Sequence, residues 1–128
     1  MIDTNVAIHA RDGSETVFAK LLSHAGEVVI SALSLAELQW GVYSQTEFAA
    51  LRRVRLQELL RAVPVIPFGR EAAEAYGVLI GQIGWSRSRQ MDRLIAAHAL
   101  TIPAVLVTAN IADFSTIPGL SVENWIVP

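Results

Sequence analysis

Short runs of β-branched residues alternate along this chain with longer segments of helical periodicity, and this order limits the possible folds more than any other feature. It is typical of a parallel sheet with helices on both faces. The expected strands cover residues 1–3, 28–31, 63–67, 104–108 and a short stretch near 122. The expected helices cover residues 15–25, 35–43, 47–61, 70–83 and 91–100, with a helical turn over 4–10 and a turn or short helix over 110–114. Two prolines in the 63–67 strand favour an edge of the sheet or the end of a strand.

The length of 128 residues predicts one domain, spanning residues 1–128. Hydrophobic residues make up 52% of the chain and charged residues 17%, which excludes a disordered protein. With a formal net charge of −2, nucleic acid would have to be held by local patches or through a metal ion. The absence of cysteine excludes disulfides, thiolate zinc sites and thiol nucleophiles. No stretch predicts a membrane span or a signal peptide, so we expect a cytoplasmic protein.

Four acidic residues and one asparagine fall where predicted strands end or predicted helices begin. Asp3 ends the first strand, and Glu37 lies in the first turn of the helix after the second strand. Asp92 opens the most apolar helix, and Asn110 and Asp113 follow the strand after it. Ligands of open α/β sheets bind outside the carboxyl ends of the strands, so most of these side chains are expected at one edge. Asp92 is the exception, because a loop rather than a strand precedes it.

Each of these residues also has an explanation in helix stability alone. Ser34 and Glu37 have the spacing of a capping box, in which Glu37 would close on the backbone of Ser34. Asn110 can cap a short helix with Asp113 in its first turn, and the aspartates can favour helix N-termini through the dipole. Taken together, however, carboxylates gathered at one edge raise each other's pKa, and a cation relieves that cost. Hard oxygen ligands without histidine or cysteine suit Mg²⁺ or Mn²⁺.

Five segments, in order along almost the whole chain, match one known family. They are residues 2–6 (IDTNV), 31–38 (SALSLAEL), 91–100 (MDRLIAAHAL), 106–114 (LVTANIADF) and 118–125 (PGLSVENW). On these segments the chain resembles a PIN-domain ribonuclease of the VapC type, the toxin half of a bacterial toxin–antitoxin pair. The resemblance implies a PIN-like three-layer α/β/α fold with a central, mostly parallel twisted sheet.

The resemblance also implies roles for individual residues. Asp3 matches the first metal-binding acid of the family, Glu37 the second acid, and Asp92 the third, which is also a metal ligand. The fourth polar position lies within residues 108–113, where both Asn110 and Asp113 fit, and we favour Asp113 because it carries charge. The implied supporting residues are Thr4, Asn5, Thr108 and Asn110.

The implied reaction is hydrolysis of RNA phosphodiester bonds that leaves a 5′-phosphate and a 3′-hydroxyl. Asp3 and Asp92 would hold Mg²⁺, or Mn²⁺ in its place, directly or through water, and Glu37 and Asp113 are further candidates as ligands. A metal-bound water is acidic enough to attack phosphorus, and the metal neutralises charge on the phosphate. The resemblance further implies a cognate antitoxin that blocks the acidic site, and a homodimer formed through a self-complementary face.

Several other residues were weighed for a role at the site. Three arginines lie close to Asp92 in sequence: Arg87, Arg89 and Arg93. They are candidates for contacts with RNA phosphates, and the alternative is that they are solvated surface residues. A second group of arginines lies on one predicted helix but not on one face of it: Arg52, Arg53, Arg55 and Arg61. This distribution favours a role as solvated surface residues over a place at the border of an RNA groove. His98 is expected in the core or an interface, because its spacing from Asp92 turns it away from that acid. Of Trp40 and Tyr43, at least one is expected in the core.

Two other functions compete with the ribonuclease hypothesis. One is a catalytically weak module of the same fold that binds a protein partner or RNA, motivated by the short first strand and the open choice of fourth acid. Binding of Mn²⁺ would distinguish it from the nuclease. The other is a phosphatase with Asp3 as nucleophile. It is disfavoured because haloacid-dehalogenase-like enzymes have an acid where Asn5 stands, and because the only lysine is Lys20.

Overall fold

The computed structural model describes residues 1–44 and 47–126. The helices are α1 (Thr4–Arg11), α2 (Glu15–Ser23), α3 (Ala32–Ser44), α4 (Ala49–Ala62), α5 (Arg70–Ile83), α6 (Gln90–Thr101) and the 3-10 helix η1 (Ile111–Phe114). The strands are β1 (Ile30–Ser31), β2 (Val65–Ile66), β3 (Leu106–Val107) and β4 (Val122–Glu123). Across residues 1–44 and 47–126, no helix has both the length and the hydropathy needed to cross a membrane.

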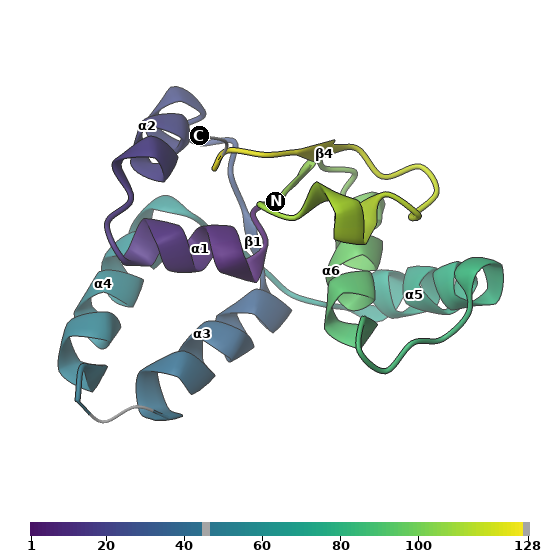
Figure 1. The fold of residues 1–128 in the computed structure, drawn as a ribbon, viewed down its shortest axis with the longest axis horizontal. Helices are drawn as coiled ribbons and strands as arrows, with labels where there is room; N and C mark the ends of the chain where they lie inside the picture. Colours follow the sequence, from purple (N-terminus) through teal and green to yellow (C-terminus); the bar gives the residue numbers. More distant parts are fainter. Residues whose placement is uncertain (45–46, 127–128) are drawn as a thin grey trace.

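The strands are parallel, and the N-terminal residues lie at their centre (Figure 1). β1 pairs with β2, and β3 pairs with β4. Ile2 joins the two pairs, because it forms parallel bridges to Ile30 of β1 and to Val107 of β3. The order across the sheet is therefore β2, β1, residues 1–3, β3 and β4. β2 lies at an outer edge, as its flanking prolines predict.

Side chains that alternate along the strands build one apolar cluster on each face of the sheet. Ile2, Ile30 and Val107 belong to the cluster that α1, α2, α3 and α4 cover. Met1 and Leu106 belong to the other cluster, together with residues of α5, α6 and η1. Figure 1 shows the same division, with α1 to α4 on one side of the strands and α5 and α6 on the other. The predicted α/β fold with helices on both faces is confirmed.

α1 is a complete helix where the sequence analysis expected only a helical turn. Asp3 caps it, because its Oδ1 accepts a hydrogen bond from the backbone N–H of Val6 at 2.9 Å. This cap satisfies one of the amides that the first turn of any helix leaves without a partner. The chain thus passes from the central strand into a helix at Asp3 itself.

α3 begins at Ala32, directly after β1 and before the expected start at residue 35. Ser31 supports this early start, since its Oγ accepts a hydrogen bond from the backbone N–H of Leu33 at 3.1 Å. Ser34 is therefore an interior, fully buried residue of the helix. The predicted capping box between Ser34 and Glu37 is wrong, because a residue inside the helix cannot serve as its N-cap.

Candidate active site

Asp3 lies at the carboxyl end of the central strand. Its backbone N–H donates to the carbonyl of Val107 at 2.9 Å, which fixes it to β3. Its side chain is buried, with the residue only 7% exposed. Burial raises the pKa of Asp3, and hydrogen bonds from Thr108 and from nearby backbone amides offset part of that rise. Thr108 is fully buried at the end of the neighbouring strand, where a supporting residue would have to be.

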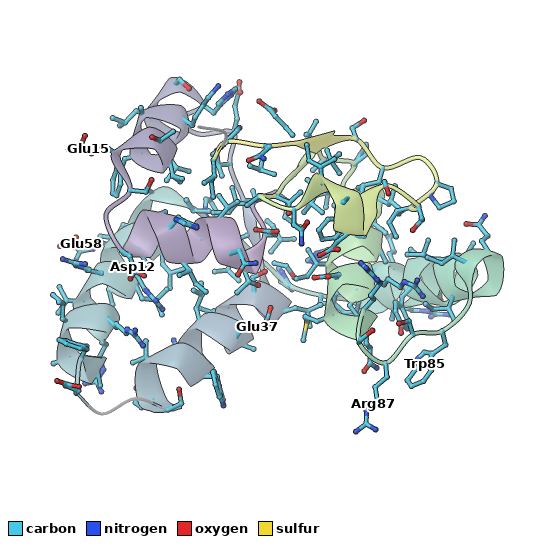
Figure 2. The ribbon with its side chains drawn as sticks, viewed as in Figure 1. Asp12, Glu15, Glu37, Glu58, Trp85 and Arg87 are labelled. Carbon is cyan, nitrogen blue, oxygen red and sulfur yellow. The ribbon has the colours of Figure 1, made fainter. Side chains whose placement is uncertain are left out.

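Glu37 reaches the same edge of the sheet from α3. The hydroxyl of Thr4 donates to Glu37 Oε1 at 2.5 Å, and Ser34 Oγ lies 3.0 Å from the same hydroxyl. One threonine therefore ties the start of α1 to α3. Since Thr4 directly follows Asp3, this contact also links the first two acids of the candidate site. Figure 2 shows Glu37 where α1 and α3 approach each other.

Asp92 lies in the first turn of α6, which packs against α3. Burial raises its pKa most, followed by the negative charges of Asp113 and Asp3 and, more weakly, Glu37. Arg89 opposes this rise. The other three acids predicted for the site are therefore close enough to act electrostatically on Asp92. The packing of α6 carries Asp92 to the edge of the sheet, although no strand directly precedes it.

Asp113 and Asn110 form a bonded pair on η1. The amide of Asn110 donates to Asp113 Oδ2, and Arg89 donates to Asp113 Oδ1 at 2.9 Å. The hydroxyl oxygen of Thr108 accepts a hydrogen bond from the backbone N–H of Asn110 at 3.0 Å. Both candidates for the fourth position are thus near Asp92. The choice of Asp113 over Asn110 stays a prediction.

A cavity of about 700 Å³ opens beside the acids. Asp3, Glu37 and Asp92 line it, together with Thr4 and Asn5. Asp113 does not belong to the lining and acts on the site through its charge next to Asp92. Residues that lie far apart in the sequence therefore meet around one space, as a shared metal site requires.

The donors at this cavity fit a hard divalent cation. Carboxylate and hydroxyl oxygens gather there, and no histidine lines the cavity, which is the donor chemistry that suits Mg²⁺ or Mn²⁺. A cation would also relieve the repulsion that raises the pKa of Asp92. Among the described residues, no three such side chains stand close enough to hold an ion as they are. To become ligands themselves, Glu37 and Asp113 would have to leave the groups that hold them, Thr4 for Glu37 and Arg89 with Asn110 for Asp113.

The three arginines near Asp92 in sequence have other positions than the cavity wall. Arg89 forms an ion pair with Asp113 at 2.9 Å, and Arg93 donates to the carbonyl of Gly84 at 2.5 Å. Arg87 is exposed and extends away from the helices (Figure 2). None of the three lines the cavity. Their contact with RNA stays a prediction.

Two other arginines line the cavity, Arg11 and Arg52. Arg11 is not among the predicted site residues, and Arg52 was predicted to lie on a solvated helix. A sequence signal for Arg11 does exist: together with Thr4 and Ile8 it has the spacing of one helix face that starts beside Asp3. For Arg52 no such signal exists, because its place depends on how α4 packs against α1 and α3.

His98 is a core residue, as expected. It is 2% exposed, its Nδ1 lies 2.8 Å from Ser31 Oγ, and its ring packs edge-on against Phe68. Burial lowers the pKa of His98. Trp40 and Tyr43 are 73% and 65% exposed, so the expectation that one of them lies in the core is wrong. Trp40 lines the cavity instead, while Leu38 of the same helix enters the core.

The comparison with protein families agrees with this geometry. The family model described as "PIN domain" matches residues 1–120 of the chain. The chain belongs to the PIN domain family. The match covers Asp3, Glu37, Asp92 and Asp113, and it confirms the resemblance drawn from the sequence segments.

Similar proteins and structures place this PIN domain near VapC proteins. It is 34% identical to "Ribonuclease VapC2" of Rickettsia felis over 98% of this chain and 96% of that protein. It is 28% identical to "tRNA(fMet)-specific endonuclease VapC" of Salmonella typhimurium, with 98% and 96% covered. The fold matches that of a chain in the structure described as "Crystal structure of VapBC2 from Rickettsia felis bound to a DNA fragment from their promoter". That match has a TM-score of 0.87 at 33% identity and covers 98% of this chain and 97% of that one. The predicted fold class is confirmed.

Proposed function

We propose that this PIN domain is an endoribonuclease that depends on Mg²⁺ or Mn²⁺, and that it is the toxin of a toxin–antitoxin pair. The observation that supports this most strongly is the cavity lined by Asp3, Glu37 and Asp92. The names of similar proteins, ribonuclease and tRNA(fMet)-specific endonuclease, support RNA as the substrate. A metal ion between the carboxylates and a phosphate would neutralise their mutual repulsion, which is why metal dependence is part of the proposal.

In the proposed mechanism, Asp3 and Asp92 would hold the metal ion directly or through water. Once bound, the ion would supply an acidified water and neutralise charge on the scissile phosphate. Glu37 orients the attacking water, and Thr4 keeps Glu37 in place through its hydrogen bond. Asp113 adds negative charge next to Asp92, while Asn110 and Arg89 fix its side chain.

The proposed partner is an antitoxin protein that covers the acidic cavity. The support comes from similar solved structures, which are described as VapBC complexes. One of them, VapBC-1 from nontypeable Haemophilus influenzae, has a TM-score of 0.79 and 26% identity over 99% of this chain. We further propose a homodimer through a self-complementary face, which is the commonest symmetry of soluble oligomers.

The decisive experiment incubates the purified chain with structured RNAs, with and without Mg²⁺ or Mn²⁺. We expect cleavage only when the metal is present, with products that carry a 5′-phosphate. Asp92→Asn keeps the shape of the side chain and removes the charge that holds the metal, so cleavage should fall by at least a hundredfold.

A matched control is Glu15→Gln, which also removes one negative charge. Glu15 lies on α2, away from the cavity (Figure 2), and this variant should cleave as the wild type does. Equal cleavage by wild type and Asp92→Asn would refute the assigned site. Absence of Mn²⁺ binding in calorimetry would favour the alternative of a binding module without catalysis.

A further inference from the structure

The cavity beside the acids has two chemically different ends. Its longer walls are helix faces with residues at helical spacing: 4, 5, 8 and 11 on α1 with its C-cap at 12, and 36, 37, 40, 41 and 44 on α3. Asp3 caps the start of α1, and Glu37 lies in the second turn of α3. The other end, toward α4, contains Arg11 and Arg52. The metal chemistry proposed above uses only the acidic end.

Arg11 presents a buried cation at the second end. The residue is 6% exposed, and its described hydrogen bonds both go to Asp12, whose side chain is 49% exposed. A guanidinium has five N–H donors, so one half-exposed carboxylate leaves most of its capacity unused. Its Nη1 lies 3.6 Å from the place where a side chain on Gly41 would begin. The absence of a side chain at Gly41 keeps the space beside this guanidinium open.

Arg52 approaches the same glycine from α4. Its Nη1 donates to the carbonyl of Gly41 at 3.1 Å. Within residues 1–44 and 47–126, no carboxylate forms an ion pair with it. Two guanidinium groups therefore meet around Gly41, while Asp12 supplies the one negative partner. This end of the cavity carries a local excess of positive charge in a chain whose net charge is −2.

The two ends belong to one cavity and are joined by the α3 wall. Gly41 follows Glu37 by one turn of α3, an axial separation of about 6 Å. A single strand that lies along the cavity would therefore contact both the acids and the arginines. Trp40 lies on the same wall and is 73% exposed, so it offers a bare aromatic surface at the rim. A phosphate site with an aromatic side chain beside it is the usual construction for binding a single strand.

We propose that Arg11 and Arg52 bind the RNA phosphate next to the one that is cleaved, with Trp40 stacked on the adjoining base. Guanidinium groups suit this role because their paired N–H donors match two phosphate oxygens. This inference rests on the proposed ribonuclease function and deepens it by assigning the residues that position the strand. The acids then act on one phosphate while the arginines hold its neighbour.

Binding is measured by fluorescence anisotropy with a labelled single-stranded RNA in EDTA, so that cleavage has no part in the result. Arg52→Gln should weaken binding about tenfold at low salt and reduce the salt slope by about 0.7 to 1, as loss of one phosphate contact does. Arg52→Lys should recover part of the affinity. Arg61→Gln is the matched control, because it removes the same charge from an exposed position at the end of the same helix.

A second set of RNAs carries one neutral methylphosphonate at each linkage in turn. At one linkage the neutral group should weaken binding to the wild type and Arg61→Gln about tenfold, and have a clearly smaller effect on Arg52→Gln, in which only Arg11 is left to contact that phosphate. Additive effects at every linkage would overturn the proposal. If Arg52→Gln bound RNA normally and lost affinity only for the antitoxin, this end would be a site for an acidic protein segment instead.

The two proposals fail in different ways. If the wild type cleaved RNA in a metal-dependent way but the methylphosphonate effects were additive, the proposed phosphate site would be refuted and the proposed nuclease function retained. Non-additive binding at one linkage without any cleavage would remove the nuclease and keep an RNA-binding site. Arg52→Gln should melt within a few degrees of wild type, since the side chain is only half-buried and loses one hydrogen bond to Gly41 at most.

Discussion

The hydrogen bond from Thr4 to Glu37 yields the sharpest stability prediction. The perturbation is Thr4→Val, which keeps the branched shape and removes the hydroxyl. The O···O distance of 2.5 Å is that of a strong hydrogen bond to a carboxylate. Such bonds to charged groups contribute about 1.5 to 3 kcal/mol. Both side chains are half-buried, so water replaces part of the loss, and we expect about 1 to 2 kcal/mol.

The assay is urea unfolding of the metal-free protein, followed by circular dichroism. With a slope of about 1.5 kcal/mol per molar urea, the midpoint should fall by about 1 M. Thr16→Val is the control: Thr16 is exposed in the first turn of α2, so its loss should change stability by less than about 0.5 kcal/mol. Cleavage by Thr4→Val should also slow, because Glu37 is then free to turn away.

A double-mutant cycle with Glu37→Met isolates the energy of the hydrogen bond between Thr4 and Glu37. Methionine keeps the length of the side chain, but it cannot accept the hydrogen bond from Thr4. We expect a coupling of about 1 kcal/mol or more between Thr4 and Glu37. A coupling below about 0.3 kcal/mol would refute the reasoning, because the two effects would then be independent. The loss in Thr4→Val would in that case belong to the neighbouring contact with Ser34.

Three further predictions concern charge and packing. Burial and neighbouring acids raise the pKa of Asp92, so in EDTA the charge destabilises the fold at neutral pH. Asp92→Asn should therefore unfold at higher urea than wild type at pH 7.5. This advantage should shrink as the pH falls through the raised pKa, and an unchanged gap down to pH 4 would contradict it. Burial lowers the pKa of His98, so the folded state favours its neutral form. The stability that neutral His98 gives the fold is therefore complete above the ordinary histidine pKa of about 6.5, and it is lost as the pH falls through the lowered pKa. His98→Phe should weaken that acid-side loss in thermal melts, and an identical pH profile would count against it. Leu38→Ala removes a core side chain that is 1% exposed and should cost about 2 to 5 kcal/mol in chemical unfolding. A cost below about 1 kcal/mol would mean that this face of α3 is not packed as described.

Most of the secondary structure could be predicted because local patterns suffice for it. The alternation of strand and helix segments, the edge position of β2 and the core position of His98 all follow from side-chain periodicity and proline chemistry. Helix starts were less predictable. Ser31 supports an early start of α3, which no residue pattern distinguished from the capping box expected at Ser34. Trp40 and Tyr43 show the same limit, because their apolar character predicted burial of at least one where the fold leaves both exposed.

The sequence by itself determined the order of elements and the acids at their ends, since propensities and side-chain period act over a few residues. Only the tertiary structure decided which of those acids share a space. Asp92 has no strand before it and meets Asp3 because α6 packs against α3. Arg11 and Arg52 converge on Gly41 for the same kind of reason. Distances between remote side chains depend on how whole helices pack on the sheet, and no local pattern carries that information.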